Sequence, residues 1–272
     1  MNDLYLATSL RLSETLTRAY STSFGLSVGL VSPELRPAIY AVYGMVRLAD
    51  EIVDTPVADA AAALSRFQED VFQAVRRRHS SNPILHSYQW AFHYYGLSQS
   101  PVDAFFRSME MDLQPQVYDS ARFNEYVHGS AEAIGLLCLP IFCSGFPGLA
   151  NSLADGAQKL GAAYQKVNFL RDIASDYRER GRSYFPGVTP GRLSEGQKQA
   201  IEADIRADFR AAAQSIPRLP RQAQRGVRLS YLFFDELLRI LAGQSADQLF
   251  RQRASVPKPL KLWIYLRAAT GL

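Results

Sequence analysis

Two pairs of carboxylates have the spacing of a helical metal site. Asp50 and Asp54 are four residues apart, and Asp172 and Asp176 repeat that interval. Asn168 lies a further four residues before Asp172. Residues four apart on a helix lie on one face, one turn above the other. Like charges at this spacing destabilise a helix, so we expect cations between the two acidic faces.

The neighbours of these acids predict that both helices are buried. Leu48 and Ile52 flank the first pair, and Val167 and Ile173 flank the second. Arg47 has the spacing to pair with one carboxylate, but it cannot neutralise two. Carboxylate and amide oxygens, without His or Cys nearby, suit Mg²⁺ or Mn²⁺ rather than zinc. Mg²⁺ commonly completes its coordination with substrate phosphates, so the pattern favours metal-dependent chemistry on a diphosphate. A single acidic pair of this kind would more often be a solvated, salt-bridged face.

An arginine-rich segment follows the second acidic face. Arg178, Arg180 and Arg182 lie between Asp176 and Pro186. Guanidinium groups bind phosphate oxygens well, and such a loop could close over a bound substrate. Capping of the helix end is the alternative role for each of these arginines.

The elements that must position these residues are helices. Apolar residues recur every three or four positions almost throughout, and no alternating strand pattern is present. About nine helices are predicted between stop signals. The stop signals are Ser32-Pro33, Thr55-Pro56, Asn82-Pro83, Ser100-Pro101, Phe146-Pro147-Gly148, Gly181, Pro186 to Pro190, and Val256-Pro257. We expect an all-α fold in which residues 1–272 form one domain.

Composition is that of a folded protein that does not span a membrane. The chain has 272 residues, of which 47% are hydrophobic and 21% charged. Its two cysteines cannot form a disulfide framework or a zinc site. The N-terminus lacks the basic start and apolar run of a signal peptide, and the longest apolar stretch is too short to cross a bilayer. A cytoplasmic location is therefore expected.

Positive charge gathers toward the C-terminus. From Arg221 onward nine Lys or Arg face three Asp or Glu, a balance of +6, so the other 220 residues carry 4 − 6 = −2. A basic segment suits nucleic acid, anionic lipid or a phosphorylated small molecule, although it is also typical of a solvated helix surface. Nucleic acid is not expected, because two buried acidic faces would repel a phosphate backbone.

Together these motifs resemble the squalene/phytoene synthase family. The first part of the resemblance lies at residues 20–24 (YSTSF), 36–43 and 47–54, and the second at residues 160–176 and 180–186. The similarity extends from about Tyr20 to the C-terminus. It implies an isoprenoid-synthase-type helical bundle around a central apolar cavity, with the two acidic faces opposed across its mouth.

The resemblance also implies a reaction. Within the family, residues 166–172 (KVNFLRD) and 129–132 (GSAE) are most similar to those of bacterial phytoene synthases. These enzymes join two molecules of geranylgeranyl diphosphate head to head through prephytoene diphosphate. The product is 15-cis-phytoene, and the step is the first committed one of carotenoid biosynthesis. The alternatives are condensation of farnesyl diphosphate to squalene or dehydrosqualene, and a family-like assembly or binding factor without catalysis.

By matched position, the resemblance assigns roles to individual residues. The metal ligands, for Mg²⁺ or alternatively Mn²⁺, would be Asp50, Asp54, Asn168, Asp172 and Asp176. The catalytic residues would be the four aspartates and Tyr126. The substrate-binding residues would be Ser21, Ser23, Phe24, Tyr43, Arg47, Gln165, Asn168 and Arg171, with Ser21, Ser23 and Tyr126 at the entrance and Phe24 and Tyr43 on the cavity wall. NADPH is not expected: no glycine-rich strand–turn–helix motif is present, although family members that use NADPH lack one too.

Several positions depart from the family pattern. Glu51 replaces an aspartate, His128 replaces a tyrosine, and Glu132 places a carboxylate where relatives carry a small residue. Tyr231 and Phe234 compete for the position of an aromatic residue near the last long helix. Released diphosphate, Tyr126 and His128 all remain open as the proton acceptor.

A phytoene product would be insoluble in water. We therefore expect peripheral contact with the inner surface of the membrane, and the basic C-terminal region is the candidate contact.

Overall fold

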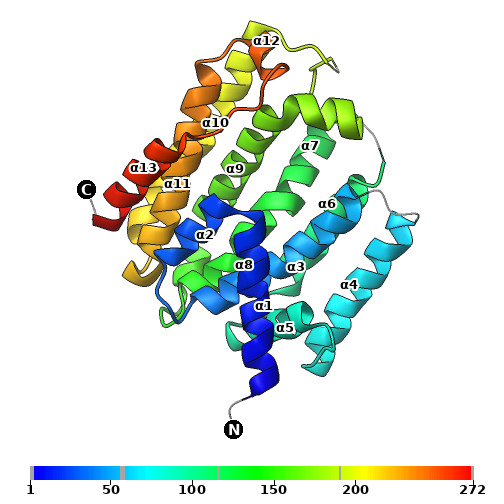
Figure 1. The fold of residues 1–272 in the computed structure, drawn as a ribbon, viewed down its shortest axis with the longest axis vertical. Coiled ribbons are helices and arrows are strands. Elements are labelled where there is room, and N and C mark those ends of the chain that lie inside the picture. Colours follow the sequence, from blue (N-terminus) through cyan, green and yellow to red (C-terminus); the bar gives the residue numbers. More distant parts are fainter. Residues whose placement is uncertain (1–2, 56–58, 115–116, 190, 271–272) are drawn as a thin grey trace.

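The structure, a computed structural model, describes residues 3–55, 59–114, 117–189 and 191–270. Helices make up most of it (Figure 1). They are α1 (Leu4–Tyr20), α2 (Thr22–Gly29), α3 (Arg36–Asp54), α4 (Ala60–Arg77), α5 (Pro83–Tyr94), α6 (Gln99–Met111), α7 (Ser120–Val127), a π-helical turn (His128–Glu132), α8 (Ala133–Phe142), α9 (Leu149–Arg180), α10 (Glu195–Ser215), a 3₁₀ turn (Ile216–Arg218), α11 (Arg221–Ala242), α12 (Ala246–Leu249) and α13 (Lys258–Thr270). The all-α prediction is confirmed: within the described ranges the β-type contact is a single bridge between Val117 and Ser183.

Local sequence signals explain where helices begin and end. Asn82 caps α5 with its side chain while Pro83 occupies the first helical position. Gly181 ends α9 in the left-handed conformation that glycine adopts freely. One predicted stop is wrong: Ser100-Pro101 lies in the first turn of α6, where the missing N–H of a proline has no cost. Two further prolines of the predicted stops, at positions 56 and 190, lie outside the described residues.

The described part of the chain contains more helices than the nine predicted. The additional elements are short ones, such as α2 and α12, which a periodicity of three to four residues cannot separate from their neighbours. The break between α1 and α2 is made by Ser21, whose extended backbone ends one helix while its side chain accepts a hydrogen bond from Phe24 N at 3.3 Å. A single serine is a weak sequence signal for the end of a helix.

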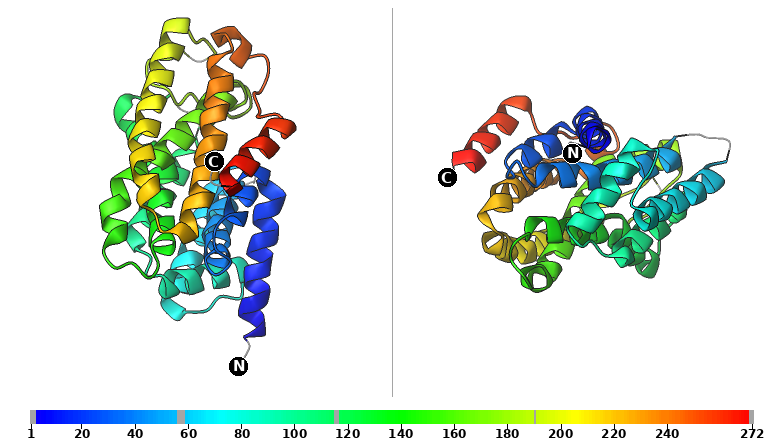
Figure 2. Two further views of the ribbon diagram at one scale, coloured as in Figure 1. Left: turned by 90° about the vertical axis from the view of Figure 1, so that its left-hand side faces the viewer. Right: turned by 90° about the horizontal axis from the view of Figure 1, so that it is seen from below.

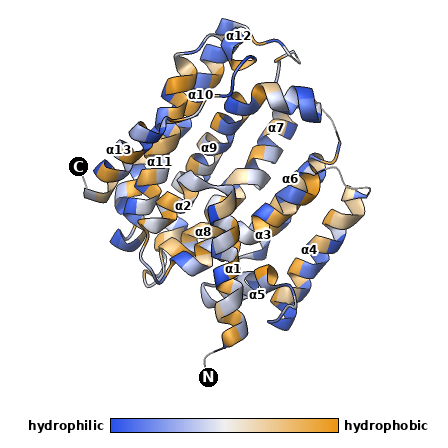
Figure 3. Cartoon of the chain, viewed as in Figure 1, coloured by the Kyte–Doolittle hydropathy of each residue, from blue (hydrophilic) through white to orange (hydrophobic). Residues whose placement is uncertain are grey.

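The long helix α9 passes through the body of the bundle (Figures 1 and 2). It packs along α10 and α8, and it also contacts α7, α11 and α12. At Gly161 the π-helical turn comes so close that a Cβ atom would lie 2.5 Å from the carbonyl oxygen of Ala131. Hydrophobic and hydrophilic residues alternate around most helices, as their amphipathic patterns require (Figure 3).

The core has two main parts. One joins α3, α4, α5 and α6, and the other joins α7, α9, α10 and α11 with the C-terminal helices. None of the helices that the structure describes combines the length and the apolar character needed to cross a bilayer.

Candidate active site

A cavity of about 680 Å³ lies between the two parts of the core. Side chains from α2, α3, α8, α9 and α11 form its wall, together with residues 253–256 that follow α12. Its volume falls within the usual range for small-molecule sites. The prediction of a bundle around a central cavity is therefore confirmed in its geometry.

One face of α9 forms a long strip of this wall. The contributing residues follow a spacing of three or four positions: Leu153, Gly156, Ala157, Leu160, Gly161, Tyr164, Gln165, Asn168 and Arg171. Eighteen residues separate the two ends of this strip, which corresponds to about 27 Å along a helix. The strip is apolar at the Leu153 end and polar at the Arg171 end.

All eight residues predicted to bind substrate line this cavity. They are Ser21, Ser23, Phe24, Tyr43, Arg47, Gln165, Asn168 and Arg171. The first five come from α2, α3 and the junction before α2, and the last three come from α9, more than a hundred positions later in the chain. The fold thus brings the two halves of the predicted binding set to one surface.

Aromatic rings are part of the apolar wall. Phe24 and Tyr43 stack with their ring centroids 5.0 Å apart. Elsewhere on the wall, Phe234 stacks on Tyr164 at 4.1 Å, and both line the cavity. Tyr231 instead packs against Phe209 and is not part of the lining. Of the two C-terminal aromatics that the sequence left open, Phe234 is the one that faces the cavity.

Arg47 stands at the polar end of the cavity. Its guanidinium lies 4.4 Å from the ring centroid of Tyr20, 2.5 Å from Glu51 and 3.9 Å from Asp50. Its Nε is buried and has no hydrogen-bond partner within the described residues. A buried guanidinium nitrogen without a partner has a strong electrostatic preference for an anionic group.

Arginines lie between the two acidic faces. Arg180 contacts Asp54 of α3 at 3.4 Å and Asp176 of α9 at 3.0 Å. Arg182 donates to Asp54 at 3.1 Å and to the carbonyl oxygen of Val53 at 3.2 Å. Guanidinium groups from the end of α9 and the loop after it thus supply positive charge between the two acidic faces.

Asp172 is paired with two further arginines. Arg171 donates to it from the preceding position, and Arg253 Nε lies 2.6 Å from its Oδ1. Burial alone would raise the pKa of Asp172, but the hydrogen bonds from these arginines outweigh burial and lower it. Arg253 and Lys261 line the cavity too, so the C-terminal segment adds two cations that were not among the predicted site residues.

The other acids are less well compensated. Burial raises the pKa of Asp50 to about 7, because Arg47 offsets only part of the penalty and Asp54 adds repulsion. Burial likewise raises the pKa of Asp176 to about 6, with Asp172 adding repulsion against the attraction of Arg180. Both carboxylates would gain from additional positive charge.

In the described ranges, no three His, Cys, Asp or Glu side chains stand together as a metal-binding group. The donors nevertheless suit a hard divalent cation, since all are carboxylate or amide oxygens on two helices that the arginines bridge. The raised pKa values of Asp50 and Asp176 fit as well, because they mark negative charge that the arginines leave uncompensated. The residues present therefore fit Mg²⁺ or Mn²⁺.

Tyr126 does not lie where it was expected. It is absent from the cavity lining and is 3% exposed, so the expectation of a place at the substrate entrance is not met. Its hydroxyl donates to Asp112, which also accepts from Tyr184 at 3.0 Å. Arg182 completes this buried cluster, with its Nε 3.4 Å from Asp112 and its Nη2 2.6 Å from the carbonyl oxygen of Asp112.

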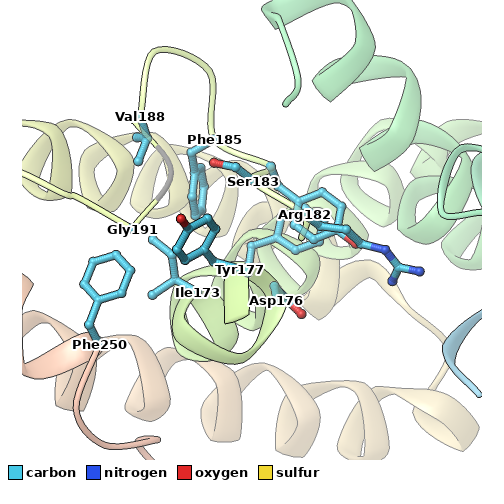
Figure 4. A pocket seen from close by; sticks show the side chains of 11 residues that line it. Ile173, Asp176, Tyr177, Arg182, Ser183, Phe185, Val188, Gly191 and Phe250 are labelled. Atoms are coloured by element: carbon cyan, nitrogen blue, oxygen red, sulfur yellow. The ribbon is translucent and has the colours of Figure 1, made fainter. Parts of the chain in front are cut away.

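Figure 4 shows a smaller pocket next to the acidic end of α9. Asp176 and Arg182 lie beside Tyr177, Phe185 and Phe250 around a space of about 10 Å³. That volume holds no more than about one water molecule. The pocket is therefore a packing gap behind the acidic face and not a second ligand site.

Two of the residues that depart from the family pattern form a pair of their own. His128 Nδ1 and Glu132 Oε2 are 3.0 Å apart across the π-helical turn, and the His128 side chain is 46% exposed. Ser130 and Ala131 of the same turn face the cavity instead. The π-helical turn thus directs this pair away from the cavity.

A comparison with protein families shows which family the chain belongs to. The model of the family described as "Squalene/phytoene synthase" matches residues 17–259. This chain belongs to the squalene/phytoene synthase family. The curated relatives include "Phytoene synthase 3, chloroplastic" of Zea mays, which is 31% identical over 270 residues, covering 90% of this chain and 62% of that protein.

A second relative represents another branch of the family. "Presqualene diphosphate synthase" of Rhodopseudomonas palustris is 28% identical over 245 residues, covering 82% of this chain and 84% of that protein. The family and these relatives are prenyltransferase-type enzymes, which is the enzyme class expected from the sequence. The chain spans 62% of the maize relative and 65% of "Phytoene synthase, chloroplastic" of Daucus carota.

Solved structures agree on the fold. A dehydrosqualene synthase in complex with a ligand superposes with a TM-score of 0.85 at 18% identity, covering 98% of this chain and 97% of that one. A squalene synthase from Alicyclobacillus acidocaldarius superposes with a TM-score of 0.75 at 23% identity, covering 86% and 93% of the two chains. The helical architecture of this chain is thus that of synthases in the family.

Proposed function

We propose that the chain catalyses the head-to-head condensation of two geranylgeranyl diphosphates through prephytoene diphosphate to 15-cis-phytoene, the first committed step of carotenoid biosynthesis. The observation that carries the proposal is the single cavity wall shared by all eight expected substrate-binding residues. The similarity to plant phytoene synthases supports the choice of substrate within the family.

The polar end of the cavity is suited to hold diphosphate. Arg47 and Arg171 from the two long helices, with Arg253 from the C-terminal segment, bring positive charge to it, and Lys261 adds a further cation to the cavity lining. Guanidinium groups bind phosphate oxygens in pairs and hold a leaving group in a fixed position. Ser21 and Ser23 add hydroxyl groups to the same cavity wall.

Mg²⁺, or Mn²⁺ in its place, would be held by Asp50, Asp54, Asn168, Asp172 and Asp176. When bound it supplies electrostatic stabilisation to a departing diphosphate. Arg180, which pairs with Asp54 and Asp176, would then be free to turn toward diphosphate oxygens. The chemistry needs no reductant, so NADPH is not part of the proposal.

The apolar end of the cavity would accommodate the prenyl chains and exclude water. An allylic cation must meet the double bond of the second substrate before it meets solvent, which a closed apolar wall ensures. The stacked rings of Phe24 and Tyr43 present π faces that stabilise positive charge nearby. The position of Tyr126 gives no support to a role as proton acceptor, so released diphosphate is the acceptor we propose.

A product assay tests the proposal. The purified chain is incubated with Mg²⁺ and either geranylgeranyl or farnesyl diphosphate, without NADPH, and the extracted hydrocarbon is identified by mass. We expect a forty-carbon hydrocarbon from geranylgeranyl diphosphate. If the only product is a thirty-carbon hydrocarbon from farnesyl diphosphate, the substrate is farnesyl diphosphate and the proposed substrate is wrong. No product from either diphosphate would support the binding-factor alternative.

The proposal includes a location. A cytoplasmic enzyme with a water-insoluble product must release it to an apolar phase, so we propose peripheral contact with the inner membrane surface.

A further inference from the structure

Helix α13 presents an apolar face to solvent. Leu262, Trp263 and Leu266 are 60%, 54% and 52% exposed, although each is a large hydrophobic side chain. They lie at helical intervals of one, three and four, so they form one contiguous face. Contiguous apolar surface of this kind marks a place where a partner or a membrane binds.

The opposite face of α13 fixes the helix to the protein. Ile264 and Ala268 are 4% and 1% exposed and belong to the core that α13 shares with α11. Both views of Figure 2 show α13 at the periphery of the bundle. The helix is thus apolar on two sides, of which one is already used in folding.

The segment that carries this face is basic. Residues 248–270 contain five Lys or Arg and no Asp or Glu. Arg267 lies over the ring of Trp263 at 5.0 Å from its centroid, and Lys258 is exposed at the start of the helix. Apolar side chains, a tryptophan and flanking basic residues on one helix are typical of binding in the headgroup region of an anionic bilayer.

The same segment borders the cavity. Ala254, Ser255, Val256 and Lys261 all line it, and Lys261 directly precedes Leu262 on the exposed face. A bilayer in contact with α13 would thus lie next to the cavity wall. This continuity favours a lipid surface over a protein partner, because the apolar product of the proposed function has to leave the cavity for an apolar phase.

We propose that α13 is a membrane-docking helix that inserts Leu262, Trp263 and Leu266 among the headgroups of an anionic bilayer, with Lys258 and Arg267 on the lipid phosphates. The inference rests on the proposed function only for the identity of the product. The binding itself requires no substrate, so it is measured separately from catalysis.

The first experiment is sedimentation of the full chain with vesicles. Vesicles of phosphatidylcholine with phosphatidylglycerol are compared with vesicles of phosphatidylcholine alone, at low and high salt. We expect binding to the anionic vesicles that weakens as salt rises. Equal binding to both compositions, or to neither, would overturn the proposal.

Two variants locate the contact. The triple variant Leu262→Ser, Trp263→Ser, Leu266→Ser should lower the partition coefficient about tenfold or more, because three large apolar side chains no longer insert. The double variant Lys258→Gln, Arg267→Gln leaves the apolar face intact and should lose affinity for anionic vesicles only. Tyr94→Ser is the matched control, since Tyr94 is 68% exposed on the distant helix α5 and should not affect binding.

A spectroscopic readout follows the helix directly. The chain has two tryptophans, so Trp90→Phe leaves Trp263 as the single one. Its emission should shift to the blue on addition of anionic vesicles. An unshifted emission would contradict insertion. If the triple variant instead converts a dimer to a monomer in solution and binds vesicles like the parent chain, the face is an interface between two copies and the membrane proposal is wrong.

Discussion

The guanidinium of Arg182 donates to the carboxylate of Asp54 at 3.1 Å, although the two residues are 128 positions apart in the chain. Arg182 is 6% exposed, and it also donates to the carbonyl oxygens of Val53 and Asp112. The contact ties the C-terminal turn of α3 to the loop that follows α9. The relative position of the two acidic faces therefore depends on this buried arginine.

Substitution of Arg182 should be costly for stability. In Arg182→Leu, Asp54 and Asp112 lose a buried partner, and removal of one member of a buried ion pair typically costs about 3–5 kcal/mol. Urea unfolding of the variant measures the loss, and Arg182→Lys should recover part of it. The matched control is Arg239→Gln, because Arg239 forms an exposed pair with Glu236 and should leave the unfolding midpoint unchanged. Equal midpoints for the Arg182→Leu and Arg239→Gln variants would contradict the role of Arg182.

Asp112 should give the free energy of unfolding a particular pH dependence. Burial raises its pKa to about 6 from 3.8, against the opposing effects of Arg182 and the two tyrosine hydroxyls. Between these values the folded chain holds a proton that the unfolded chain has lost. The contribution of Asp112 is therefore fully present below about pH 4 and falls as pH rises to about 6, by up to about 1.4 kcal/mol per unit. Asp50 and Asp176 add slope of the same sign, so Asp112→Asn should reduce the slope in a series of urea titrations without abolishing it. An unchanged slope would disprove the assignment to Asp112.

Divalent cation and diphosphate should stabilise the chain together. If the acidic faces bind a metal–diphosphate complex, Mg²⁺ with inorganic diphosphate should raise the Tm more than either alone. Asp172→Asn should abolish the rise and lower product formation by about 10²–10³-fold, the usual effect of losing a key electrostatic contact. Asp204→Asn is the control, because Asp204 pairs with Lys166, which does not line the cavity. A full Tm rise in Asp172→Asn would refute the metal assignment.

The depth of the cavity should select chain length. Ala157 lies near the apolar end of the α9 strip, so Ala157→Leu would shorten the space for a prenyl chain. We expect the ratio of forty-carbon to thirty-carbon product to fall about tenfold or more when both diphosphates are supplied. Asn151→Leu introduces the same side chain at an exposed position of the same helix and should leave the ratio unchanged. An unaltered ratio in both variants would place the determinant elsewhere.

Helical periodicity was sufficient to predict the parts of the site that lie on single helices. Asp50 with Asp54, and Asn168 with Asp172 and Asp176, share faces because of the 3.6-residue turn. Arg171 was assigned by the family resemblance instead, and the structure places it on the cavity wall with Gln165 and Asn168. Contacts between segments that are distant in the chain leave no such pattern in the sequence. Neither the pairing of Arg182 with Asp54 nor that of Arg253 with Asp172 follows from spacing along the chain.

Some of the missed residues had weak signals. Asp112 is an acid at the end of an apolar helix face that includes Phe105 and Met109, which predicts burial and a cation partner. The segment with Arg253 and Lys261 lacks acids, but its basic residues had lipid, nucleic acid and phosphate as alternative partners. Tyr126 was placed at the entrance by the matched motif, whereas the fold turns its hydroxyl toward Asp112.

The continuity of α9 restricts how such a site can change over time. A single helix of 32 residues carries the apolar strip, the amide and the two carboxylates. Inserting or deleting one residue midway, near Leu160, would rotate one half of the helix by about 100° relative to the other. The apolar end of the strip and the end that carries the carboxylates would then face different sides of the bundle. Point substitutions along the strip can alter the accepted chain length while leaving the ionic end in place, so new specificities in this lineage should arise by exchange of residues and not by change of helix length.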